Sequence, residues 1–147
     1  KPILSWVLFI PSLWVGYSTW GYVLLEPVKT PKHIYQQAAS YFEENAQVAL
    51  VDFSEQFLLF SDYRMTHFGY HAEHDAQLKA AWLWIEEGPS RYIIVSTDVI
   101  TACFDPKAAI ELGYAHRSDW VALSKQARLP SCLPNVEPAQ RFQHRPQ

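Results

Sequence analysis

The longest hydrophobic segment of the chain runs from Ile3 to Leu25 and contains no charged side chain. A helix of this length would span roughly 34 Å, enough to cross a hydrocarbon core about 30 Å thick. Trp6 lies near one end of the segment, and Trp20 and Tyr22 lie near the other, as amphipathic rings do at membrane interfaces. The pattern therefore predicts a transmembrane helix over residues 1–26.

Two other interpretations of this segment stay open. A signal peptide has a shorter apolar core of about 7–15 residues and then a small-residue cleavage site, and no A-x-A pattern follows Leu25. A buried helix of a soluble protein has a similar composition. The chain opens at Lys1 within an apolar stretch, so we expect a longer protein in which this is the last membrane helix.

Beyond Glu26 the hydrophobic pattern alternates between the strand type and the helix type. Short aliphatic or aromatic runs predict strands at residues 46–53, 63–70, 91–97 and 119–124. Helical spacing and end signals predict helices at residues 31–45 and 73–87, and a short helix from Asp105-Pro106 to Gly113. In the first of these, Thr30 should cap the helix and Pro31 should occupy its first position. The segment 55–60 fits either a strand or a helical turn.

Strands that alternate with helices are typical of the α/β class. We therefore expect a small α/β sandwich with a largely parallel or mixed sheet over residues 27–128. Residues 129–147 contain four prolines and many polar side chains, which predicts a mostly irregular tail.

Composition narrows the function classes. The 147 residues carry a formal net charge of −3 and no basic run, so we expect no nucleic-acid partner. The sequence has five glycines, and it lacks the G-x-S-x-G, G-x-x-x-x-G-K and G-x-G-x-x-G patterns of nucleophile elbows and nucleotide loops.

Candidate chemistry is densest between Leu50 and His71. Asp52 and Glu55 follow an apolar run, where they could act as an acid–base pair at a strand end or cap the next turn. His67, His71 and His74 have spacings of four and three. On one helix they could bind zinc, but Gly69 interrupts that helix, so the alternative is a structured turn. We assign no metal site.

Two further features could be functional or structural. Cys103 and Cys132 could form one disulfide, which would close a loop of about 29 residues and stabilise the domain by roughly 3–4 kcal/mol in an oxidising compartment; the alternative is two buried thiols. Arg117, in YAHRSDW, could bind a phosphate or carboxylate. Its alternative role is an ion pair with Asp119 or Glu111.

The segments VALVDFSEQFLLFS, THFGYH, AAWLWIEEGPSRYIIV, CFDP and LGYAHRSDW occur in this order. They resemble the C-terminal extramembrane domain of bacterial ArnT-like integral-membrane glycosyltransferases, which are related to the protein mannosyltransferases. The resemblance covers about residues 27–132. It implies an inner-membrane enzyme with many helices and a periplasmic domain, which transfers a sugar from a polyprenyl-phosphate carrier to lipid A or another envelope acceptor.

By the same resemblance, the catalytic carboxylate belongs to an early extramembrane loop. No position of this chain matches that loop, so no catalytic residue is assigned. Expected partners are the lipid bilayer, the upstream transmembrane part and the polyprenyl-phosphate-sugar donor. No cofactor is expected in this segment, although the resemblance leaves room for a divalent metal in the full-length enzyme. Candidates for shaping acceptor access are Asp52, Glu55, His67 and His71.

Two other functions remain as alternatives. The first is a membrane-anchored periplasmic binding or scaffolding domain without catalysis. The second is a histidine-dependent metallohydrolase, which metal analysis of the purified protein would test.

Overall fold

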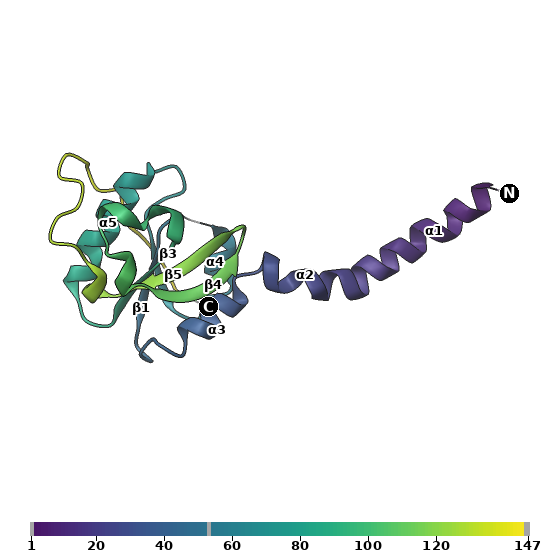
Figure 1. Cartoon of the computed structure of the whole chain (residues 1–147), viewed down its shortest axis with the longest axis horizontal. Helices are drawn as coiled ribbons and strands as arrows, with labels where there is room; N and C mark the ends of the chain where they lie inside the picture. The colour runs from purple at the N-terminus through teal and green to yellow at the C-terminus, as the bar shows by residue number, and fades with distance from the viewer. Residues whose placement is uncertain (1, 53, 146–147) are drawn as a thin grey trace.

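The structure is a computed structural model that describes residues 2–52 and 54–145. An N-terminal helix projects from an α/β domain (Figure 1). The helix consists of α1 (Pro2–Gly16), the π-helical segment η1 (Tyr17–Gly21) and α2 (Tyr22–Lys29), which follow one another without a break. The expected architecture, an apolar helix followed by an α/β domain, is confirmed.

The N-terminal helix is long and apolar enough to cross a membrane over the 22 residues Ser5–Glu26, and none of its most apolar window is buried inside the chain. Trp14 and Trp20 are 66% and 77% exposed, so this segment is not a core helix of the domain. Hydroxyl groups along it bond to their own backbone: Ser12 Oγ donates to the Leu8 carbonyl at 2.8 Å. Thr19 Oγ1 donates to the Val15 carbonyl at 2.6 Å, which leaves the outer surface of the helix predominantly apolar.

The domain is built on one mixed sheet of six strands in the order β4-β5-β3-β1-β2-β6. The strands are β1 (Gln47–Leu50), β2 (Arg64–His67), β3 (Arg91–Ser96), β4 (Ile110–Ala115), β5 (Ser118–Leu123) and β6 (Phe142–His144). β1 pairs in parallel with both β2 and β3, whereas β4, β5 and β6 join antiparallel. The predicted strands at 46–53, 63–70, 91–97 and 119–124 correspond to β1, β2, β3 and β5, with Phe53 outside the described residues.

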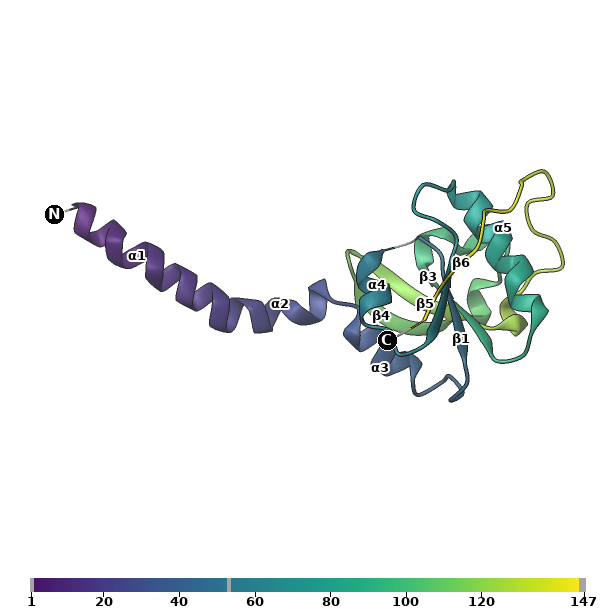
Figure 2. The same cartoon turned by 180° about the vertical axis from the view of Figure 1, so that it is seen from behind.

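Helices cover both faces of the sheet (Figures 1 and 2). α4 (Glu55–Leu59) connects β1 to β2, and its Phe57 packs with α3 (Lys32–Ala38) on one face. α5 (His74–Trp84) and the 3-10 turn η2 (Ile85–Glu87) connect β2 to β3 on the other face. The β1-to-β2 and β2-to-β3 connections run in opposite directions across the sheet. Because both crossovers have the same handedness, they cover opposite faces of the sheet.

The helix predicted at 73–87 is confirmed, but the helix predicted at 31–45 is shorter, because α3 ends at Ala38 and turns follow. Thr30 does not cap α3, and Pro31 is the N-cap residue of this helix, not its first helical residue. Its hydroxyl instead donates to the Glu26 carbonyl at 3.1 Å, at the end of α2. The ambiguous segment 55–60 forms α4.

The prediction of a helix between Asp105 and Gly113 was wrong. Asp105 caps only a 3-10 turn, η4 (Pro106–Ala108), by accepting a hydrogen bond from the Lys107 backbone at 3.0 Å. The chain then enters β4, which is paired with β5. Gly113 has a φ of +115° beside an irregularity in the β4–β5 register, so this glycine accommodates a bulge and does not end a helix.

The C-terminal tail is mostly irregular but supplies an edge strand that the sequence did not predict. β6 pairs with β2, with His67 opposite Phe142 and Met65 opposite His144. Before β6 the tail lies against α5 (Figure 2), where the Trp82 indole donates to the Leu129 carbonyl at 2.9 Å. Two further 3-10 turns, η3 (Thr97–Ala102) and η5 (Lys125–Ala127), follow β3 and β5.

Candidate functional site

Asp52 lies at the carboxyl ends of the parallel strands β1 and β2, the edge at which α/β sheets often bind ligands. Its carboxylate is 2.8 Å from His74 Nδ1, at the start of α5. Its backbone N–H donates to Gln77 Oε1 at 3.1 Å, and the Gln77 amide donates to the Ala72 carbonyl at 2.9 Å. The polar groups of this edge thus bind one another and tie β1 to α5.

An Asp–His pair can hold a general base, because the carboxylate fixes the imidazole and its other nitrogen accepts a proton. In this pair His74 Nε2 is buried and has no hydrogen-bond partner among the described residues. A substrate therefore has no access to the nitrogen that would act as the base. The geometry favours a structural role for Asp52 and His74.

The other predicted site residues do not converge on Asp52. Glu55 is exposed at the start of α4. His71 is also exposed, and its ring lies perpendicular to that of Tyr70 with 5.0 Å between the ring centroids. His67 stacks on Phe142 of β6 with 5.2 Å between ring centroids. Burial, reinforced by the charge of His144, lowers the pKa of His67.

The histidines at positions 67, 71 and 74 do not come together as metal ligands: within residues 2–52 and 54–145, no three His, Cys, Asp or Glu side chains are placed to hold a metal ion. The role of Asp52, Glu55, His67 and His71 in acceptor access stays a prediction. Two cavities lie beside the N-terminal helix, and none of these four residues lines either of them.

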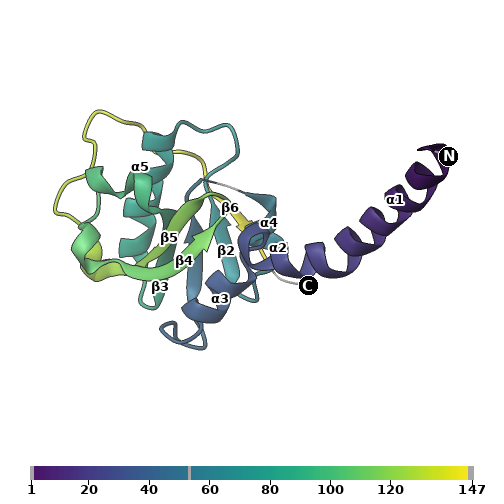
Figure 3. The same ribbon diagram turned by 45° about the vertical axis from the view of Figure 1, so that its right-hand side comes forward.

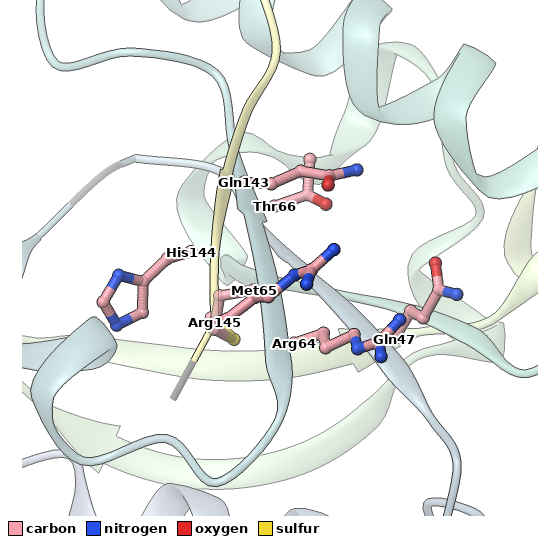
Figure 4. Close-up of a pocket in the computed structure, with 7 residues that line it drawn as sticks. All are labelled: Gln47, Arg64, Met65, Thr66, Gln143, His144 and Arg145. Atoms are coloured by element: carbon pink, nitrogen blue, oxygen red, sulfur yellow. The ribbon is translucent and has the colours of Figure 1, made fainter. Parts of the chain in front are cut away.

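A small cavity of about 60 Å³ lies where β2 meets β6. Figure 4 shows Arg64 and Gln47 on one side of these strands, with the His144 ring pointing to the opposite side. Arg145 also lines this cavity. The volume accommodates water molecules or a small anion and is too small for a sugar.

Cys103 and Cys132 form a disulfide with 4.5 Å between their Cα atoms. Both residues are buried in the core on the α5 face of the sheet. The bond joins the loop after η3 to the tail, and of the two alternatives left by the sequence it is the pairing that the structure contains.

Figure 3 shows α2 leading into the domain next to α4. Two adjoining cavities lie where the N-terminal helix meets the domain. The first, which we call the junction cavity, has a volume of about 540 Å³ and is lined by Lys29, Gln56, His116 and Arg117. The second, which we call the aromatic cavity, has a volume of about 340 Å³. Its lining residues are Tyr17, Tyr22, Leu25, Glu26, Lys29, Thr30, Gln56 and Phe60.

The junction cavity brings together three elements: α2 gives Lys29, α4 gives Gln56, and the two-residue turn between β4 and β5 gives His116 and Arg117. Burial lowers the pKa of His116 and so favours the neutral form of its ring. The predicted ion pair of Arg117 with Asp119 or Glu111 does not form. Arg117 has no salt-bridge partner in the part of the chain that the structure describes.

Sequence reasoning singled out Arg117 but missed Lys29 and Gln56 as parts of the same site. The available signal was the position of Lys29, the first cation after the charge-free segment on this side. Comparisons with protein-family models, with curated proteins and with solved structures found no match.

Proposed function

We propose that this chain is the C-terminal, membrane-anchored part of an ArnT-like integral-membrane glycosyltransferase. Such an enzyme passes a sugar from a polyprenyl-phosphate carrier to an acceptor of the bacterial cell envelope. In this proposal the α/β domain is an accessory module in the periplasm, and the catalytic residues come from the upstream transmembrane part.

The observation that carries the proposal is a fully exposed apolar helix joined directly to a disulfide-closed α/β domain. Ser5–Glu26 has 22 residues, or about 33 Å of helix, which matches the thickness of a bilayer core. An exposed apolar surface of this size is stable in lipid and unstable in water. The segments that carry the family resemblance contribute to strands β1 to β5 and to α4 and α5, as expected for a structural module.

The disulfide supports placement on the oxidising side of the inner membrane. Structural disulfides persist in the bacterial periplasm and are rare in the cytosol of most bacteria. Cys103 and Cys132 are 0% and 3% exposed, so the bond lies within the core of the domain, where thiol reagents have little access.

The size of the native protein distinguishes the two candidate functions, the glycosyltransferase and the membrane-anchored binding or scaffolding domain. An antibody against residues 30–145 should detect, in membranes of the source cells, a product several times larger than the 17.0 kDa of this chain. A native product of about that size would support the anchored domain and overturn the transferase assignment.

The reaction itself is tested with membranes that contain the full-length product. We expect label from a polyprenyl-phosphate-linked sugar to move to an envelope lipid or protein, and we expect membranes from a deletion strain to show no such transfer. Absence of transfer from every polyprenyl-phosphate sugar tried, with the protein present and inserted, would contradict the proposal.

A further inference from the structure

In the proposed membrane-anchored arrangement, the junction cavity lies at the depth at which lipid phosphates are found. The charge-free segment ends at Leu25, and Lys29 follows one helical turn later on α2. In a spanning helix this turn lies in the headgroup layer, where Lys and Arg side chains extend toward lipid phosphates. This step rests on the membrane-anchoring part of the proposed function and is independent of sugar transfer.

The charges around the cavity favour an anion. Lys29 and Arg117 have no salt-bridge partner among the described residues, and both line the junction cavity. Among the described residues, Glu26 is the one carboxylate that lines either of the two cavities. Two cations against one carboxylate leave a net positive charge next to the bilayer surface.

The two cavities together match the two chemical parts of a phospholipid. The junction cavity has cationic and amide groups, whereas Tyr17, Tyr22 and Phe60 give the adjoining aromatic cavity an apolar wall. Lys29 and Gln56 line both cavities, so the polar and apolar parts are continuous. A lipid with its phosphate in the junction cavity would have its glycerol and the start of its acyl chains along the aromatic cavity.

We propose that the junction cavity binds the phosphate group of an anionic phospholipid from the surrounding leaflet. Arg117 offers a planar fork of N–H donors that suits phosphate oxygens, and Lys29 provides a point charge. Gln56 can donate a further hydrogen bond through its side-chain amide. The bound lipid would hold the domain against the membrane in one orientation.

Native mass spectrometry of the 147-residue chain in detergent micelles tests this site. With equal amounts of phosphatidylglycerol and phosphatidylcholine added, we expect retained phosphatidylglycerol to exceed retained phosphatidylcholine by about fivefold or more. The double variant K29Q/R117Q should lower phosphatidylglycerol retention to the level of phosphatidylcholine. The variant K29R/R117K keeps both charges and should retain the preference.

The matched control is K107Q/K125Q, which removes two positive charges from turns η4 and η5 and should leave the preference unchanged. Equal loss in this control would overturn the proposal, because net charge alone would then explain the binding. So would a wild-type chain with no preference for phosphatidylglycerol.

A final arm separates a membrane lipid from free phosphate. Soluble glycerol phosphate should not displace the bound lipid, because it lacks the acyl chains that would lie along the aromatic cavity; efficient displacement would contradict the lipid assignment. Failure of the chain to associate with vesicles at all would instead overturn the membrane anchor, and with it the proposed function.

Discussion

Asp52 has a φ of 62°, a conformation that asparagine and aspartate tolerate better than most residues. This backbone turn directs its carboxylate to His74 and its N–H to Gln77. The residue that looks most catalytic in the sequence is therefore fully engaged in joining β1 to α5. A polar side chain after a buried strand is informative about function only when its partners are known.

Two histidines make the stability of the domain depend on pH. Burial is the main cause that lowers the pKa of both His67 and His116, so the unfolded chain binds protons more readily than the folded chain. Stability should be greatest above pH of about 6.5, the ordinary value for histidine, and should fall as the pH decreases toward the folded pKa values. Thermal melting of the chain in detergent between about pH 5 and pH 8 measures this slope.

The variant H116Q should melt with a shallower dependence on pH, because it removes one of the two groups. Q37A is the matched control, because Gln37 is an exposed residue of α3 that does not titrate, and it should keep the wild-type slope. An unchanged slope in H116Q would show that His116 does not contribute.

Phe57 and Leu59 lie on the same short helix and should respond differently to truncation. Phe57 is 0% exposed, its ring lies 4.3 Å from that of Trp120, and F57A should cost about 3–5 kcal/mol of unfolding free energy. Leu59 is 79% exposed, so L59A should change stability by no more than about 0.5 kcal/mol. Urea denaturation followed by Trp fluorescence measures both, and equal losses would mean that α4 packs through another face.

At the scale of elements, the two-residue turn of the β4–β5 hairpin has a backbone conformation that its own sequence does not favour. His116 and Arg117 have φ values of 51° and 68°, and Ala115 faces Ser118 across the turn. A two-residue turn with positive φ at both positions favours Asn-Gly. The chain instead places an imidazole and a guanidinium there, and both line the junction cavity.

R117G should therefore stabilise the domain by about 0.5–1 kcal/mol, because glycine adopts this conformation without steric cost. The same variant should lose the preference for anionic lipid. G113A is the opposite control: its Cβ would enter a backbone with φ +115° and approach His33 at 3.6 Å, so it should lower the melting temperature. A destabilised R117G would contradict the prediction.

The elements that sequence patterns predicted are those with a strong hydrophobic signal. β1 and β3 each contain a run of buried aliphatic residues. Branched aliphatic side chains are enriched in strands because they pack well on a pleated, half-buried surface. β4 was missed because Gly113 suggests a helix end, while its role at a bulge depends on pairing with β5. β6 was missed because its three residues, Phe142 to His144, have no apolar pattern and form a strand only beside β2.

At the scale of the whole molecule, the disulfide closes the core on the α5 face. It spans 29 positions, and a loop of that length should stabilise the folded state by about 3–4 kcal/mol in the chain-entropy model. The variant C103A/C132A should unfold at a lower denaturant concentration by a corresponding amount. Chemical denaturation of the two proteins in detergent, each with and without reductant, gives the measurement.

Reductant present during unfolding should move the wild-type transition toward that of C103A/C132A and leave the variant unaffected. Coincident transitions for the oxidised protein and the variant would show that the bond adds no stability.

The candidate site is harder to predict than the fold, because its residues come from three distant segments. Lys29 ends the N-terminal helix, Gln56 lies on α4 and Arg117 lies at a hairpin turn. No spacing rule connects them; only the packing of α3 against β4, with His33 Nε2 2.9 Å from the Tyr114 carbonyl, brings the hairpin beside α2. The sequence did predict the apolar helix that leads to Lys29.

β6 is the last strand of the sheet in chain order, which has a consequence for folding. The backbone edge of β2 pairs with residues 142–144, so it has no strand partner on that side until all the other strands have been synthesised. Exposed edges of this kind template pairing between chains. Products truncated before residue 142 should therefore self-associate, and quality-control proteases should clear them faster than the protein that contains β6.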